Sequence, residues 1–238
     1  MSTLTPTQTV GEIVTQNPAL SRVFEQLKID YCCGGKLPLA EACDRQGLDL
    51  NHVVSLLEAE RGRIADQSKT VNPADMTLTE LADHIEATHH AYLRAELPRL
   101  YELSKKVANV HGERDDRLRN VHATLCALAE ELTSHMMKEE RVLFPMIRQM
   151  EAGVNDAAAH CGSISAPIRQ MEFEHDQAGS ALSDLRSLTD QFTPPEWACN
   201  TYRALLDGLQ TLEQDLHQHI HKENNVLFPR AQELEQRR

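Results

Sequence analysis

The sequence lacks the features of a membrane or secreted protein. None of its 238 residues belongs to an apolar run near the roughly 18 residues of a membrane span, and the polar start Met-Ser-Thr-Leu-Thr-Pro has no signal-peptide core. Aromatic residues are also scarce, at 4% of the chain. We therefore expect a cytoplasmic protein with no membrane-spanning segment.

The chain also has fewer basic than acidic residues. The chain has 24 Lys and Arg against 36 Asp and Glu, which gives a formal charge of −12. Such a balance repels phosphate groups, so neither nucleic acid nor an anionic membrane is expected as a partner. In an acidic chain, the twelve histidines are the unusual feature.

Cysteines are few and thinly spread. No two stand in C-x-x-C spacing, which excludes a zinc ribbon, and a disulfide framework is not expected in a reducing compartment. The six are Cys32, Cys33, Cys43, Cys126, Cys161 and Cys199.

The first part of the chain contains residues that typically start and end short helices. Thr9 and Glu12 form a capping box. Pro38 opens a helix that Gly47 ends, and Asn51 caps the next one. We expect a small helical domain over residues 1–65, followed by a linker without periodicity from 61 to 75.

Long amphipathic helices fill the remainder. Pro98 interrupts the first of them, but the apolar stripe continues, so we expect a kink and no stop. Short connections predict up-down-up-down order, and the whole chain is predicted to be all-α with a four-helix bundle over 76–238. The helices are expected over 77–110, 115–150, 165–191 and from Pro194 to the C-terminus.

Two of these helices carry the same motif. H-x-x-K-E-x-x-V-L-F-P begins at His135 and again at His219, so that Glu139 and Glu223 each follow a His by four residues. One such pair is usually a solvated surface pair, because residues four apart share a helix face. The duplication predicts two facing helices that bring two His and two Glu together, as in carboxylate-bridged two-metal sites.

The other two helices place a His at the same height. At ~1.5 Å per residue, His90 and His175 lie within the same ~15–25 Å of one end of the bundle as the repeated motif. His89 fits this position about as well as His90. His111 would lie ~30 Å farther along, and we leave it out. Imidazole and carboxylate donors without thiolates favour iron or manganese.

The remaining residues near these positions have simpler roles. Glu174 and Glu131 are placed to accept hydrogen bonds from ligand histidines or to line an access path. His217 and His221 flank His219 and are expected at the surface. No partner pattern is found for His52, His84, His122 and His160.

Cys32 and Cys33 sit in a glycine-rich turn, Asp30-Tyr-Cys-Cys-Gly-Gly-Lys36. The following helix N-terminus and Lys36 would favour thiolates. A reactive pair and two buried structural cysteines both fit this spacing.

Several motifs together resemble the iron–sulfur cluster repair (RIC) family over almost the whole chain. The resemblance implies a small cysteine-bearing domain joined to a hemerythrin-like di-iron bundle, in a cytoplasmic stress protein that restores clusters damaged by nitric oxide or peroxide. The motifs are D-Y-C-C-G-G-K at Asp30, H-H-x-x-L-R at His89, V-H-G at Val110, S-H-M-M-K-E-E at Ser134, E-H-D at Glu174 and the second repeat at His219.

The resemblance also implies a ligand set, and it favours His90 over His89. Two non-haem iron ions would be bridged by carboxylates and by an oxo or hydroxo oxygen. Cys32 and Cys33 would dock a damaged cluster, relay iron or carry a nitrosyl group. The implied ligands are His90, His135, Glu139, His175, His219 and Glu223.

Four functions remain in competition. Repair by iron donation to damaged or apo iron–sulfur proteins ranks first. A nitric oxide-transforming enzyme ranks second, and it would need an outside electron donor because no flavin or nicotinamide motif is visible. A hemerythrin-type sensor or carrier of O₂ or NO has no need of Cys32-Cys33. The fourth alternative is a bundle that binds no metal and has only a structural role. A homodimer stays open.

Overall fold

The described part of the chain is helical. A computed structural model describes residues 4–64, 72–154 and 163–237. No strand occurs in these ranges, where the β-type pairing is one isolated bridge between Thr9 and Pro38. The N-terminal part contains α1 (Val10–Gln16), the 3-10 turn η1 (Pro18–Leu20), α2 (Ser21–Leu27), α3 (Leu39–Gln46) and α4 (Leu50–Ile64).

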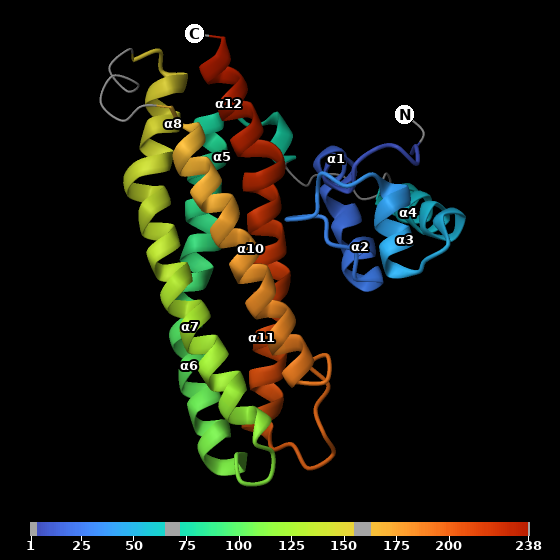
Figure 1. Cartoon of the computed structure of the whole chain (residues 1–238), viewed down its shortest axis with the longest axis vertical. Helices are drawn as coiled ribbons and strands as arrows, with labels where there is room; N and C mark the ends of the chain where they lie inside the picture. Colours follow the sequence, from blue (N-terminus) through green and yellow to red (C-terminus); the bar gives the residue numbers. More distant parts are fainter. Residues whose placement is uncertain (1–3, 65–71, 155–162, 238) are drawn as a thin grey trace.

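Four antiparallel helical columns form the bundle (Figure 1). They follow one another up and down along the chain, which confirms the predicted all-α class and the up-down-up-down order. After the turn η2 (Pro73–Asp75) they are α5 (Leu78–Ile85) with α6 (Ala91–His111), α7 (Arg117–Lys138) with α8 (Phe144–Glu151), α10 (Ser165–Leu188), and α11 (Asn200–Lys222) with α12 (Phe228–Gln236).

Two expected connections fall partly outside the described residues. The linker expected over 61–75 was predicted too long, because α4 continues to Ile64 and η2 spans Pro73–Asp75, and its middle, 65–71, lies outside the described residues. In the crossover expected around 151–163, residues 155–162 lie outside them, including His160 and Cys161. Within the described ranges, no helix combines the length and the apolar character needed to cross a membrane.

Local capping chemistry was mostly predicted correctly. The capping box of Thr9 and Glu12 is present, and Gly47 ends α3 in a left-handed conformation with φ 65°. The prediction that Asn51 caps the N-terminus of α4 was wrong. The Asp49 carboxylate accepts a hydrogen bond from the backbone N–H of His52 at 2.8 Å, and α4 begins one residue after Asp49. An Asp satisfies the free N–H groups of a first turn as well as an Asn does.

The start of the last long helix was also predicted wrongly. α11 begins at Asn200, six residues after Pro194. The backbone N–H of Ala198 bonds to the carbonyl of Pro195 at 2.9 Å, a single turn that does not continue as a helix. Proline disfavours helical backbone in the residue before it, and the preceding residues up to Phe192 (φ 59°) are left-handed. By contrast, α6 continues through Pro98 as expected.

A polar layer divides the apolar core of the bundle into two clusters. The lower cluster reaches up to Leu93, Met136, Ala178 and Leu216. The upper cluster starts at Ile85, Leu143, Met171 and Val226. Between the two clusters, each column carries at least one of the predicted ligands, and His135 directly precedes Met136 at the edge of the lower cluster. The side chains of these ligands are therefore held by well-packed helices from both sides.

Three turns next to this layer are π-helical. They are η3 (Glu86–His90), η4 (Glu139–Leu143) and η5 (Glu223–Leu227). Pro145 and Pro229 follow the last two. A proline has no N–H to donate and its ring clashes with the carbonyl four residues earlier, so the helical ladder is displaced locally. Each of these two prolines thus follows a wider helical turn that begins at a predicted glutamate ligand.

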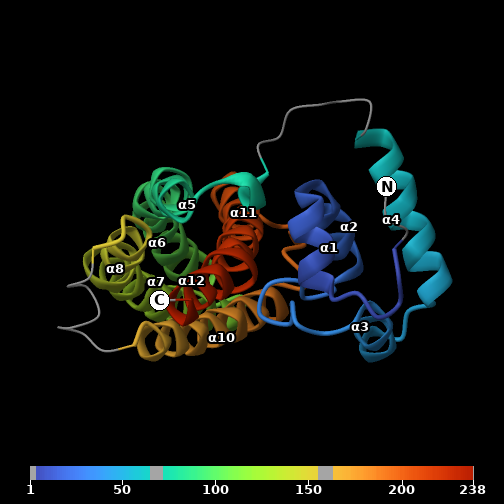
Figure 2. The same cartoon turned by 90° about the horizontal axis from the view of Figure 1, so that it is seen from above.

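The N-terminal part packs on the side of the bundle. It has its own apolar core, which includes Phe24, Tyr31 and Leu57. Figure 2 shows α1 and α2 beside α11, with α4 on the far side. Lys36 forms an ion pair with Glu172 of α10 at 3.1 Å. The cysteine turn after α2 therefore faces the bundle of its own chain.

Asn225 fastens this turn to the bundle. Its Nδ2 donates to the carbonyl of Cys32 at 2.9 Å. The contact is so close that a Cβ on Gly35 would lie 2.3 Å from the Asn225 Oδ1, and a Cβ on Gly11 would lie 2.5 Å from it. A side chain at either position would therefore have to displace the Asn225 amide from its place against the turn.

We predict that Asn225→Ala loosens the cysteine turn without unfolding the bundle. The substitution leaves a buried carbonyl unpaired, which costs about 1–3 kcal/mol. Amide hydrogen exchange at residues 30–36 should become faster. The matched control is Arg141→Ala, since Arg141 holds the same place in the other motif and is exposed. Equal exchange in the two variants would contradict the docking role of Asn225.

Candidate metal centre

Six buried side chains from the four columns converge in the polar layer. They form two groups that share both glutamates, and within each group the potential ligand atoms lie within 4.8 Å of one another. None of the six is more than 3% exposed. One group is His90, Glu139, His219 and Glu223, and the other is His135, Glu139, His175 and Glu223.

The imidazole Nε2 atoms point at the carboxylates and at each other. The Nε2 atoms of His135 and His175 are 3.1 Å apart, and Nε2 of His175 lies 3.1 Å from Oε2 of Glu223. Nε2 of His219 lies 3.0 Å from Oε1 of the same glutamate. Glu139 Oε2 has Nε2 of His135 at 3.4 Å.

Several of these atoms are buried without a hydrogen bond. They are Nε2 of His90, both carboxylate oxygens of Glu139, and Oε2 of Glu223. Buried polar atoms are normally satisfied, and an unsatisfied set aimed at one point is a gap that a cation fills. Imidazole and carboxylate donors in this number fit one or two divalent transition-metal ions.

The metal-free cluster holds its charges as ion pairs. Burial and Glu223 act to raise the pKa of Glu139, but His135 and His90 outweigh them and hold it below its ordinary value. Burial acts to lower the pKa of His135, whereas Glu139 and Glu174 raise it to about 10. Glutamates are thus ionised and His135 is protonated at neutral pH. A bound cation would displace that proton.

The residue after each shared glutamate orients a histidine of a neighbouring column. His90 Nδ1 donates to Glu140 at 2.7 Å, and His175 Nδ1 donates to Asn224 Oδ1 at 2.8 Å. Both contacts fix the ring so that Nε2 faces the centre. The repeated motif therefore does the same positioning task twice, with a carboxylate in one half and an amide in the other.

Glu174 orients a third histidine. This is one of its two expected roles, namely to accept a hydrogen bond from a ligand histidine. His135 Nδ1 donates to Glu174 at 2.8 Å, and Lys138 pairs with the same carboxylate. The hydrogen bond from His135 is the main reason that the pKa of Glu174 is lowered to about 2.

Comparison with known proteins identifies the family. Residues 79–231 match the hemerythrin HHE cation binding domain, and residues 6–61 match a domain described as of unknown function (DUF542). Over 224 residues, the chain is 42% identical to the iron–sulfur cluster repair protein YtfE of Escherichia coli O157:H7. It is 40% identical to the YtfE protein of Salmonella schwarzengrund (strain CVM19633). Each match covers 94% of this chain and 96% of the relative. The chain belongs to this iron–sulfur cluster repair family.

The family assignment agrees with the resemblance seen in the sequence, and it makes the bundle a cation-binding domain. Within that bundle His89 and His90 take different positions. His90 points into the layer, whereas His89 donates to Asp215 at 2.8 Å and stacks on His219 with centroids 5.2 Å apart. Lys222 bonds to the other nitrogen of His89. The sequence analysis did not predict these hydrogen bonds of His89 to Asp215 and Lys222. A signal was present, because Asp215 lies four residues before His219 and Lys222 lies three residues after it, on the same helix face.

Other histidines are placed partly as expected. His111 lies at the opposite end, outside both groups, beside Trp197 and Cys199. The prediction that His221 lies at the surface was wrong. Its side chain is only 6% exposed, and its Nδ1 bonds to the carbonyl of Tyr31 at 3.3 Å. His217 also stacks edge-on against Tyr31. The docked N-terminal part covers this face of α11, which local periodicity does not reveal.

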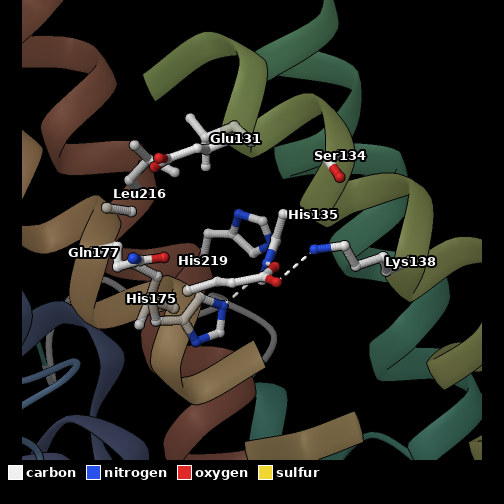
Figure 3. Close-up of a pocket in the computed structure, with 12 residues that line it drawn as sticks. Glu131, Ser134, His135, Lys138, His175, Gln177, Leu216 and His219 are labelled. Atoms are coloured by element: carbon white, nitrogen blue, oxygen red, sulfur yellow. Dashed lines mark hydrogen bonds and ion pairs between the residues drawn. The ribbon is translucent and has the colours of Figure 1, made fainter. Parts of the chain in front are cut away.

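A cavity of about 130 Å³ opens onto the candidate ligands (Figure 3). His135, His175 and His219 form one wall, and Leu216 and Ile220 supply apolar lining. Glu131 also lines it, which fits its expected place near an access path. The size suits a diatomic molecule or a few waters.

The cysteine turn lies next to the candidate centre. Cys33 Sγ donates to the backbone carbonyl of His175 at 3.7 Å. Cys32 is buried, at 4% exposure, and its Sγ donates to Asp30 Oδ1 at 3.1 Å. The two thiols thus differ in exposure, and Cys33 adjoins a predicted ligand.

We predict that the metal-free protein loses stability as the pH rises. The pKa of His135 is raised from 6.5 to about 10, so its stabilising contribution is complete below pH 6.5 and is lost as the pH rises through about 10. Denaturant unfolding of chelator-treated protein across this interval measures the effect.

His135→Gln should flatten this dependence, whereas His52→Gln, at an exposed position, should keep it. An identical slope in the two variants would show that the buried cluster does not set the stability.

Proposed function

We propose that this protein repairs damaged iron–sulfur clusters by donating iron from a two-ion centre. The observation that carries the proposal is that Glu139 and Glu223 belong to both ligand groups and are fully buried. Carboxylates shared in this way can bridge two ions. The names of the similar YtfE proteins, iron–sulfur cluster repair proteins, support the same role.

The donor set supports iron as the metal. Four imidazoles and two carboxylates suit divalent iron, and no thiolate is present in either group. Bound iron would supply ferrous ions for transfer and positions for small ligands. Each of the residues would contribute one nitrogen or a bridging carboxylate: His90, His135, Glu139, His175, His219 and Glu223.

The two parts of the chain would divide the work. We propose that residues 76–238 store the iron and that residues 1–65 present Cys32 and Cys33 to damaged or apo iron–sulfur proteins. The contact between Cys33 and the His175 backbone supports this division. The described cysteines are all free thiols, which suits the reducing cytoplasm.

Nitric oxide chemistry is the second candidate. The small cavity beside His135, His175 and His219 supports it, since its apolar lining suits a diatomic gas. Conversion of two NO to N₂O and water consumes two electrons and two protons, so this enzyme would need an external reductant.

We predict that Glu139→Ala and Glu223→Ala each lower the iron content below the expected two ions per chain. A shared ligand serves both ions, so its loss weakens both. Elemental analysis of purified protein measures the content. Glu102→Ala, at an exposed position of α6, is the control. Full iron content in both variants would exclude the bridged centre.

We predict that Cys32→Ser with Cys33→Ser leaves the iron of the His/Glu layer in place but impairs repair in cells under nitric oxide stress. The cysteines are outside both His/Glu groups. Cys43→Ser, a buried thiol elsewhere in the N-terminal part, is the control. Loss of iron from the His/Glu layer in the double variant would make the cysteines ligands of the same centre.

Transfer and turnover assays separate the two candidates. Iron that moves to an apo iron–sulfur protein under anaerobic conditions supports repair by donation. Iron that stays bound while nitric oxide becomes nitrous oxide supports the enzyme instead.

A further inference from the structure

A second cluster of potential metal ligands lies outside the His/Glu layer. Asp30, Cys32 and Cys33 place their carboxylate and thiol atoms within 4.8 Å of one another. Two thiolates and one carboxylate form a donor set that selects borderline or soft divalent ions over magnesium or calcium. The matching N-terminal domain is described as of unknown function, and neither family match assigns a metal to these residues.

Backbone hydrogen bonds pre-arrange this cluster. Asp30 Oδ1 accepts from the Cys32 N–H at 2.9 Å, and Asp30 Oδ2 accepts from the Gly34 N–H at 2.8 Å. The carboxylate is thereby fixed beside the thiols, and Oδ1 already accepts from Cys32 Sγ. A cation that replaces the thiol protons would need little movement of the chain.

The cluster faces a cavity of about 500 Å³ between the cysteine turn and the bundle. Asp176 and His217 line the same cavity and offer further donors. Gly179 of α10 lies beside Cys33, where an added Cβ would make an ordinary contact with its Sγ at 3.8 Å. The position is therefore reachable from solvent and next to α10, which carries His175.

We infer that Asp30, Cys32 and Cys33 form a third metal site, which takes one divalent iron or a similar thiophilic ion. Two thiol protons pass to solvent as the ion binds, and no electron is transferred. Because Cys33 bonds to the backbone of His175, the site adjoins the candidate two-ion centre. The existence of this metal site does not depend on the proposed function. Its role, which is to pass iron from the two-ion centre to a recipient protein, rests on the proposed function.

Cobalt(II) is the probe for the site. We expect metal-free, reduced full-length protein to bind one cobalt ion beyond those of the His/Glu layer, with thiolate-to-cobalt charge-transfer absorption. Cys32→Ser with Cys33→Ser should abolish this absorption, and Asp30→Asn should weaken the site by about tenfold or more. Cys199→Ser and Asp44→Asn, both at exposed positions, should change neither.

Two results would overturn the site. One is the absence of charge-transfer absorption in wild type. The other is unchanged affinity in Asp30→Asn, which would remove the carboxylate as a ligand. Glu139→Ala with Glu223→Ala should retain the absorption, and its loss there would place the thiols in the two-ion centre and reject a separate site.

Iron transfer to an apo iron–sulfur protein tests the role. Failure of wild type to transfer would reject the proposed function and leave the metal site intact. Equal transfer rates in wild type and Asp30→Asn would instead reject the role of the third site alone.

Discussion

The burial of Glu139 and Glu223 side by side is the constraint on which the rest of the structure depends. Both carboxylates are fully buried, and each acts to raise the other's energy when ionised. Four imidazoles compensate these charges in the metal-free protein, and a cation would do so better. The apolar clusters above and below the layer hold the helices at the spacing that keeps these charges together.

Both halves of the duplicated motif perform the same task inside the bundle, and the second half also binds the cysteine turn outside it. Glu140 and Asn224 each orient a histidine from the position after a shared glutamate. One residue later the halves differ: Arg141 is exposed, whereas Asn225 binds the cysteine turn. Asn225 therefore helps to hold the N-terminal part on this face of the bundle, together with the contact between Cys33 and the His175 carbonyl.

Much of the fold could be predicted because its signals are local. The capping box at Thr9 and the apolar stripe through Pro98 depend only on near neighbours in the chain. Predictions failed where two local signals competed. Asp49 and Asn51 are both good caps, and the double proline at Pro194 allowed either an immediate helix or a loop. Both outcomes are local contacts, and the spacing of the residues does not decide between the competing signals.

The sequence by itself brought most of the side chains of the polar layer to one height, because helix geometry fixes the faces of residues three and four apart. The choice of His90 over His89 rested on the family resemblance and not on helix geometry. His90, His135 and His175 could be brought to one height from helix length alone. Only the tertiary structure decided how the six residues divide into two groups, and which partners hold each ring. It also placed Cys33 against His175 and buried His221, since these depend on how elements distant in the chain pack together.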